Sequence, residues 1–235
     1  MLLRSKFSVL YSVKGILAFC SIVYELLLAQ TLSAFLANTV LRYSVTIGLY
    51  LFSLGLGAWC AERRWYKESG IALLITLELL LTAVGGFSVT GLYLAGGSAW
   101  FSPAVFSLTA HSLIILIGFM TGMELPLLMD LRAREEPGSE EVMLAWDYAG
   151  AVAGTVVFAL VFYSRLGLVT GALCAGFLNA LAGMLLISRC RRVEGRRPVF
   201  LKAAFGLQIA LCVLLAGAFY YGQEINRYLM LRYVS

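Results

Sequence analysis

Seven apolar stretches, each long enough to cross a lipid bilayer, divide almost the whole chain. They lie near residues 9–33, 42–61, 71–95, 104–129, 144–163, 167–188 and 200–221. A helix crosses the hydrocarbon core of a membrane in about 20 apolar residues. The loops between the stretches are short, which excludes an enzyme built on a Rossmann-type or other extramembrane fold within these residues. The prediction is an all-α integral membrane protein, a bundle of about seven transmembrane helices.

Composition agrees with this fold class. The chain of 235 residues is 61% hydrophobic and only 13% charged, whereas a soluble domain carries roughly 25% charged residues. The first stretch follows Arg4 and Lys6, as in a signal peptide, but its length and its internal Glu25 favour a retained helix. We expect a multi-pass membrane domain over residues 1–222 and a short tail or connector over 223–235.

The distribution of basic residues predicts an orientation. Of the 18 Lys and Arg residues, twelve fall at the chain start and in loops on the same side as the N-terminus. Four fall on the other side: Arg42, Arg165, Arg227 and Arg232. Because cytoplasmic loops are rich in Lys and Arg, we expect a cytoplasmic N-terminus in the inner (cytoplasmic) membrane. The C-terminus then lies outside for seven spans and inside for six, and the last stretch decides between them.

The net charge of +5 is therefore a topology signal, and no nucleic-acid role is expected because the basic residues are scattered over short loops. The densest group, Arg189 to Arg197, suits anionic lipid headgroups, so the bilayer is the expected partner. The five cysteines show no metal-ligand spacing, and neither a metal site nor a disulfide framework is predicted.

Small residues recur within several of the apolar stretches. Glycines spaced for close helix contact are Gly48, Gly55, Gly57, Gly118, Gly122, Gly150 and Gly154. Small residues four apart allow helix backbones to approach closely in lipid. We interpret these seven glycines as helix-packing positions.

Four acidic residues, Glu25, Glu78, Glu124 and Asp147, lie inside the apolar stretches. An ionised carboxylate in hydrocarbon is costly, so such groups face a bundle interior or a water-filled cavity. Measured along the helices, Glu78, Glu124 and Asp147 lie within about two turns of the cytoplasmic boundary, and Glu25 lies nearer the outer side. The first three can converge on one acidic pocket that attracts a small cation such as a polyamine, or relays protons. Alternatively, each carboxylate only locks neighbouring helices together.

Neighbouring residues sharpen these expectations. Lys14 and Glu25 share one face of the first helix but are about 16 Å apart along its axis, too far to pair directly. We expect the Lys14 side chain to extend to the cytoplasmic surface. Pro126 removes a backbone hydrogen bond beside Glu124, which can bend the helix and shape a cavity. His111 is the only histidine, and a packing or hydrogen-bonding role is expected for it.

Several motifs resemble the membrane-bound spermidine synthase-like proteins of bacteria, and together they cover nearly the whole chain. The motifs are Ser21-Ile-Val-Tyr-Glu-Leu-Leu-Leu-Ala-Gln30, Ser44-Val-Thr-Ile-Gly-Leu-Tyr-Leu-Phe-Ser-Leu-Gly-Leu-Gly57, Glu78 ahead of Gly85-Gly86, Gly122-Met-Glu-Leu-Pro-Leu-Leu128, Asp147-Tyr-Ala-Gly150, and Leu166-Gly-Leu168 ahead of Asn179.

In that family, a multi-span domain precedes a soluble aminopropyltransferase domain that uses decarboxylated S-adenosylmethionine and a polyamine acceptor. This sequence contains neither a Gly-rich nucleotide loop nor the catalytic Asp pair of that domain. The resemblance therefore implies the membrane module alone, with no cofactor and no catalytic residue in this chain. The candidate substrate-binding residues are Glu25, Glu78, Glu124, Asp147, Asn179 and Gln30.

Three functional hypotheses follow. The first is a non-catalytic membrane module that binds or moves a polyamine or other small cation through its intramembrane carboxylates. The second is an anchor or scaffold for a separately encoded soluble aminopropyltransferase-like enzyme, or a module that assembles as a homo-oligomer. The third, a membrane-embedded enzyme, has the least support because no nucleophile–base pair, metal cluster or phosphate loop is visible in the sequence.

Overall fold

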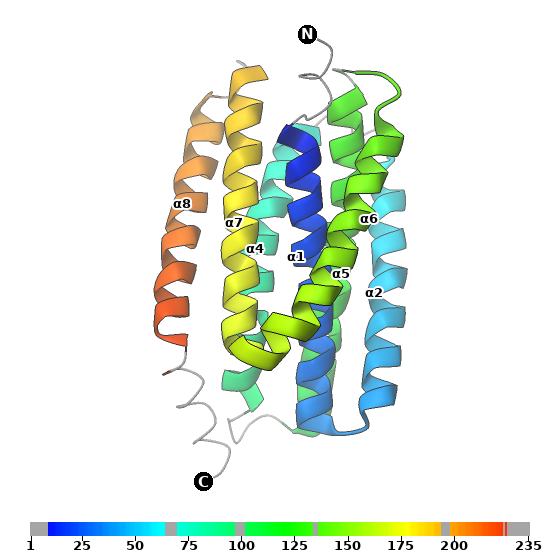
Figure 1. Ribbon diagram of the computed structural model, residues 1–235, viewed down its shortest axis with the longest axis vertical. Helices are drawn as coiled ribbons and strands as arrows, with labels where there is room; N and C mark the ends of the chain where they lie inside the picture. Colours follow the sequence, from blue (N-terminus) through cyan, green and yellow to red (C-terminus); the bar gives the residue numbers. More distant parts are fainter. Residues whose placement is uncertain are drawn as a thin grey trace.

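Helices make up nearly all of the described chain. A computed structural model describes residues 9–63, 70–96, 102–133, 136–193 and 198–222, together with Glu224. The helices within these residues are α1 (Val9–Leu36), α2 (Thr39–Ala61), α4 (Gly70–Gly96), α5 (Pro103–Ala133), α6 (Glu140–Val157), α7 (Leu168–Val193) and α8 (Pro198–Tyr220). A π-helical segment, η1 (Phe158–Leu166), continues α6 (Figure 1).

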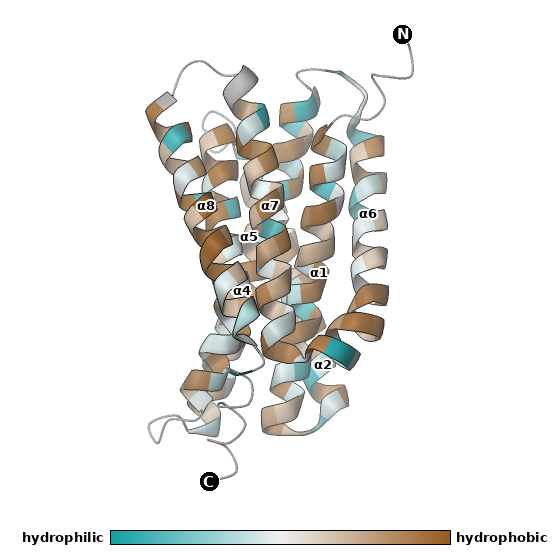
Figure 2. Ribbon diagram, turned by 60° about the vertical axis from the view of Figure 1, so that its left-hand side comes forward, coloured by the Kyte–Doolittle hydropathy of each residue, from teal (hydrophilic) through white to brown (hydrophobic). Residues whose placement is uncertain are grey.

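Seven helical segments of the described chain, with α6 and η1 counted as one, are long and apolar enough to cross a membrane. Each overlaps one of the seven apolar stretches expected from the sequence. Figure 2 shows apolar residues along every helix, with hydrophilic residues scattered among them. The tail expected over residues 223–235 lies outside the described residues except for Glu224.

The helices run alternately up and down the bundle, so α1 begins and α8 ends at opposite ends (Figure 1). The end of the bundle at which α1 begins is called the N-side. Helices α2 and α5 end there, and helix α6 begins there. Helix α1 occupies the centre and contacts α2, α4, α5, α6 and α7. Helix α8 lies at the edge, against α7 and α4. Polar side chains of α1 therefore meet most of the other helices.

Glycines bring pairs of helices into backbone contact. At Gly57 of α2 an added Cβ would clash with the backbone carbonyl of Phe119 in α5, and at Gly122 of α5 it would clash with the carbonyl of Leu54 in α2. An added Cβ at Gly118 of α5 would clash with the Ser53 hydroxyl of α2. A glycine at each position allows α2 and α5 to pack without intervening side chains.

Glycines also allow α6 to pack closely against the central helix α1. An added Cβ at Gly150 would clash with the carbonyl of Gly15, and one at Gly154 would clash with Ile22. This close approach holds α6, which carries Asp147, directly against α1.

Two of the predicted packing glycines do not pack in this way. An added Cβ at Gly48 or Gly55 would meet no atom within 4 Å, because both residues lie on the exposed face of α2. Their expected role in packing within the bundle is therefore wrong. The sequence marks these positions as small, but the rotation of α2 turns these glycines outward.

Candidate functional site

Three charged side chains from three helices meet in the N-side half of the bundle. The Lys14 ammonium of α1 lies 2.7 Å from Glu124 Oε1 of α5 and 2.9 Å from Asp147 Oδ1 of α6. The Lys14 and Glu124 side chains are each 1% exposed, and the Asp147 side chain is 22% exposed. We call these three residues the charged triad. Two carboxylates around one ammonium leave the triad with one negative charge in excess.

The buried position of Lys14 corrects the expectation that its side chain extends to the surface. Lys14 lies on the central helix, and α5 and α6 each present a carboxylate at its height. An ammonium buried without a partner would be strongly unfavourable, whereas charge-assisted hydrogen bonds offset the loss of water. The ammonium is therefore held inside the bundle.

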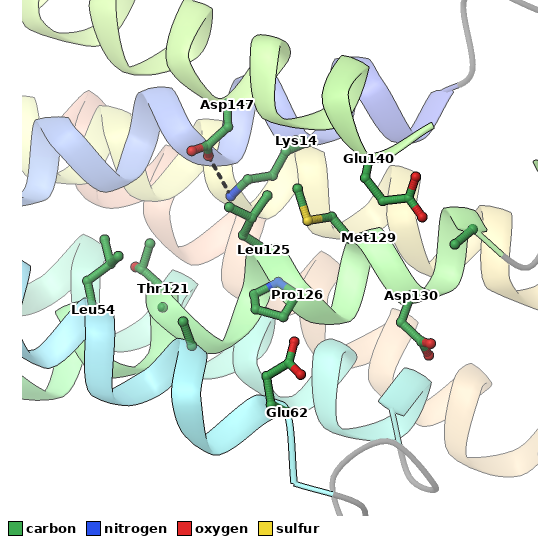
Figure 3. Close-up of a pocket in the computed structure, with 13 residues that line it drawn as sticks. Lys14, Leu54, Glu62, Thr121, Leu125, Pro126, Met129, Asp130, Glu140 and Asp147 are labelled. Atoms are coloured by element: carbon green, nitrogen blue, oxygen red, sulfur yellow. Dashed lines mark ion pairs between the residues drawn. The ribbon is translucent and has the colours of Figure 1, made fainter. Parts of the chain in front are cut away.

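A pocket of about 360 Å³ opens beside the triad at the N-side. Figure 3 shows Lys14 and Asp147 on one side of the pocket, with Glu140, Asp130 and Glu62 around the rest. Four carboxylates thus line it, and Lys14 is the one basic side chain among the lining residues described. Its apolar and small-residue wall is formed by Leu54, Ala58, Thr121, Gly122, Leu125, Pro126, Met129 and Ala133. We call it the acidic pocket.

The local sequence explains the room for this pocket. Gly122 and Pro126 line it from α5, one turn apart, and neither fills space with a long side chain. Pro126 also cannot donate a backbone hydrogen bond to the carbonyl of Gly122. The cavity expected beside Glu124 is therefore present, although Glu124 itself lies behind Lys14 and does not line it.

The carboxylates expected to converge are divided between two places. Asp147 lines the pocket and Glu124 joins it through Lys14, but Glu78 does not line the pocket. The expectation that all three form one pocket is wrong for Glu78. The depth of a residue along its helix is readable from sequence, whereas the direction in which α4 turns Glu78 depends on packing against α7.

Glu78 belongs to a buried polar network between α4, α7 and α8. Asn179 Nδ2 of α7 donates to Thr82 Oγ1 of α4 at 3.1 Å and lies 3.4 Å from Glu78 Oε2. Gln208 Nε2 of α8 donates to the same Thr82 oxygen at 2.9 Å. Asn179 was expected to be a binding residue, and the structure places it beside Glu78. We call Glu78, Thr82, Asn179 and Gln208 the amide network.

The other two candidates lie farther along α1. Glu25 is 4% exposed, and no ion pair joins it to another described residue. One turn before it, the hydroxyl of Ser21 is hydrogen-bonded to that of Tyr50 in α2. Gln30 Oε1 accepts a hydrogen bond from Tyr43 at 2.7 Å. Neither Glu25 nor Gln30 lines the acidic pocket.

Sequence reasoning missed three residues of this site and the pairing of a fourth. Glu62, Asp130 and Glu140 were not singled out because they lie at helix ends, where charged residues are usually solvated. The signal available was their position: the ends of α2 and α5 and the start of α6 all fall on the N-side. Lys14 was noted, but its pairing depends on contacts more than 100 residues away in sequence.

Known proteins named polyamine aminopropyltransferase are similar to this chain. The protein of Leptospira interrogans is 36% identical over 166 residues, which are 70% of this chain and 32% of that protein. Polyamine aminopropyltransferase 1 of Streptomyces coelicolor is 35% identical over 208 residues, 86% of this chain and 38% of that protein. The protein of Oceanobacillus iheyensis is 30% identical over 92% of this chain and 41% of its own length. These similarities support a spermidine synthase-like relationship for this chain.

The similarity covers only part of each relative. The chain spans about a third of the length of the first curated relatives it matches. No family model matches the chain. No solved structure matches it either.

Proposed function

We propose that the helical bundle binds a polyamine or a similar small organic cation in the acidic pocket, and holds or moves it at the cytoplasmic membrane. The observation that carries this proposal is the lining of the pocket, in which four carboxylates surround a single lysine that is already paired. A volume of about 360 Å³ falls within the usual range for small-molecule sites. The names of the similar proteins, which refer to polyamines, support the same ligand class.

Lys14 indicates what chemical group the site accepts. Its side chain is a primary ammonium on a four-carbon aliphatic stem, which is close in chemistry to one end of a polyamine. The triad therefore already holds one primary ammonium between Glu124 and Asp147. A ligand with two or more ammonium groups can pair one with Asp147 and another with Glu140, while its methylene groups contact Leu125 and Met129.

The spacing of the carboxylates favours an extended organic cation over a metal ion. Within the described residues, no three His, Cys, Asp or Glu side chains lie close enough together to hold a metal. The four acidic groups of the pocket instead come from the ends of α2 and α5 and from the first half of α6. A ligand with separated positive charges matches that arrangement better than a single compact ion.

This proposal assigns binding, not aminopropyl transfer, to the described helices. It is tested with detergent-purified full chain by equilibrium binding of spermidine and putrescine to the wild type and to Asp147→Asn. Asp147 is the triad carboxylate that lines the pocket, so the amide should weaken spermidine binding by about tenfold or more, the loss of one charge-assisted hydrogen bond of about 1.4 kcal/mol.

Glu25→Gln is the matched control because Glu25 is an intramembrane carboxylate outside the pocket. It should bind spermidine as the wild type does. Absence of saturable binding to folded wild-type protein contradicts the proposal, as does equal weakening in the Asp147→Asn and Glu25→Gln variants.

A second candidate function is that of a membrane anchor for a soluble aminopropyltransferase-like enzyme. The observation in its favour is that the matched relatives are much longer than the matched segment. Under this alternative, the triad only holds α1, α5 and α6 together. A soluble aminopropyltransferase would then associate with the wild type and with Asp147→Asn equally, and spermidine would bind to neither membrane chain.

A further inference from the structure

The amide network contains buried oxygen atoms that have no hydrogen-bond donor. Glu78 Oε1 and Gln208 Oε1 make no hydrogen bond within the described chain, and both side chains are 0% exposed. The amide nitrogens of the network donate to other atoms. Asn179 Nδ2 donates to Glu78 Oε2 and Thr82 Oγ1, and Gln208 Nε2 donates to Thr82 Oγ1 and the carbonyl of Ala180. Leaving a buried acceptor unpaired is energetically unfavourable. Two such acceptors in one network can each accept a hydrogen bond or coordinate a cation.

The charge of Glu78 leads to the same conclusion. No basic side chain of the described residues pairs with it, because the nearby Lys14 is bonded to Glu124 and Asp147. The ionisable groups within electrostatic range of Glu78 are Lys14, Cys20 and Tyr24 on α1 and Glu124 on α5. From α7, Cys174 interacts with Cys20 and Tyr24. Helix α8 contributes Gln208, which is neutral. A buried carboxylate that has no ion-pair partner is stabilised by binding a positive charge.

We propose that Glu78 and Gln208 form a binding site for one monovalent cation, either a proton or Na⁺. A single carboxylate with neutral amide and hydroxyl oxygens suits a singly charged ion, whereas a divalent ion generally recruits several carboxylates. A polyamine is excluded by burial, since the acidic pocket does not reach Glu78. The site is separate from that pocket and does not depend on what the pocket binds.

Gly183 of α7 shows how the fold makes room for this site. A Cβ added there would clash with the amide of Gln208, so a glycine at this position allows the Gln208 side chain to lie between α7 and α4. Gly86 and Gly176 bring the same two helices together elsewhere along their contact. The network is therefore held by close helix packing on both sides of Glu78.

The test is infrared spectroscopy of the detergent-purified full chain in a buffer in which N-methylglucamine replaces Na⁺. Without Na⁺, Glu78 must hold a proton, so the wild type should show a carbonyl stretch of a protonated carboxylic acid. Glu78→Gln should lack the component of this band that belongs to Glu78, which appears in the difference spectrum between the variant and the wild type. Glu25→Gln, the matched control for a buried carboxyl group elsewhere on the central part of the bundle, should retain it.

Titration with Na⁺ then distinguishes the two ions. Loss of the band as Na⁺ is added identifies a sodium site, and persistence of the band identifies a proton site. A wild-type spectrum that matches Glu78→Gln in the carboxylic-acid region without Na⁺ overturns the proposal.

Gln208→Met provides a second variant in which Glu78 is retained. It keeps a long unbranched side chain but removes the orphan oxygen, so the Glu78 band should shift in frequency. An unshifted band overturns the role of Gln208. None of these infrared measurements uses spermidine. A negative result for the cation site at Glu78 is therefore independent of a negative result for spermidine binding in the acidic pocket.

Discussion

Lys14 is the residue on which the interior of the N-side half depends. Its ammonium neutralises one of two carboxylates that approach from α5 and α6. The pair with Glu124 is fully buried, and a buried ion pair that loses one partner leaves an uncompensated charge. The same ammonium also occupies the position that a ligand ammonium would take beside Asp147.

We therefore predict that Lys14→Met destabilises the bundle by about 3–5 kcal/mol, because it leaves the buried Glu124 and the partly exposed Asp147 without a cation. Spermidine should restore part of this loss, since one of its ammonium groups can replace the missing one. The measurement is thermal unfolding in detergent with and without spermidine, and the rise in Tm should be larger for Lys14→Met than for the wild type.

Lys202→Met is the control for this substitution, because Lys202 is exposed on α8. It should change neither the stability nor the response to spermidine. If spermidine raises the Tm of Lys14→Met no more than that of the wild type, Lys14 is only a structural partner and does not occupy a ligand position.

Sequence could identify the charged residues of the core but not their partners. Glu78, Glu124 and Asp147 stand out because a charge inside an apolar stretch requires burial or a cavity. Whether two such groups meet depends on the order and rotation of the helices, which spacing along one helix does not determine. Lys14 illustrates this limit, because its partners lie on α5 and α6 and its own helix offers none.

At the scale of the helices, glycines control how closely α2 approaches α5 and α6 approaches α1. We predict that Gly122→Ala and Gly150→Ala each destabilise the bundle by about 1–3 kcal/mol, because the added methyl group overlaps a backbone carbonyl on the neighbouring helix. Gly150→Ala should also weaken spermidine binding, since it displaces α6 and therefore Asp147. Thermal unfolding and equilibrium binding measure the two effects.

Gly48→Ala and Gly55→Ala are matched controls on α2, where an added Cβ meets no atom within 4 Å. Both should leave stability unchanged or raise it slightly, because alanine favours a helix over glycine by about 0.5–1 kcal/mol. Destabilisation by either control equal to that of Gly122→Ala would contradict the assignment of α2 faces. The comparison also explains why the sequence wrongly predicted packing roles for Gly48 and Gly55. A sequence pattern identifies small residues but not the helix face on which they lie.

At the scale of the whole molecule, the seven helices were predictable and their neighbours were not. Hydropathy and length determine each span, because the bilayer sets both. The central position of α1, with α8 at the edge, follows from side-chain packing between distant segments. The acidic pocket is a consequence of that arrangement, since it requires the ends of α2 and α5 to meet the start of α6.

The orientation of the bundle gives the last prediction. Most of the basic residues of the sequence fall before the first apolar stretch and in the loops expected on the same side, which favours a cytoplasmic N-side. The acidic pocket would then open toward the cytosol, where a cytosolic polyamine can reach it directly. Single cysteines at two exposed turns test this in a variant whose five native cysteines are replaced by serine or alanine: Pro137→Cys on the N-side and Ala37→Cys at the opposite end.

A membrane-impermeant thiol reagent should label Ala37→Cys in intact spheroplasts and Pro137→Cys only in inverted membrane vesicles. The two sites lie on opposite ends of the bundle, so each serves as the control for the other. The reverse pattern would place the acidic pocket outside the cell and would restrict its ligand to cations of the external medium. Labelling of both sites from the same side would contradict the odd number of spans between them, α2, α4 and α5, and with it the count on which the orientation rests.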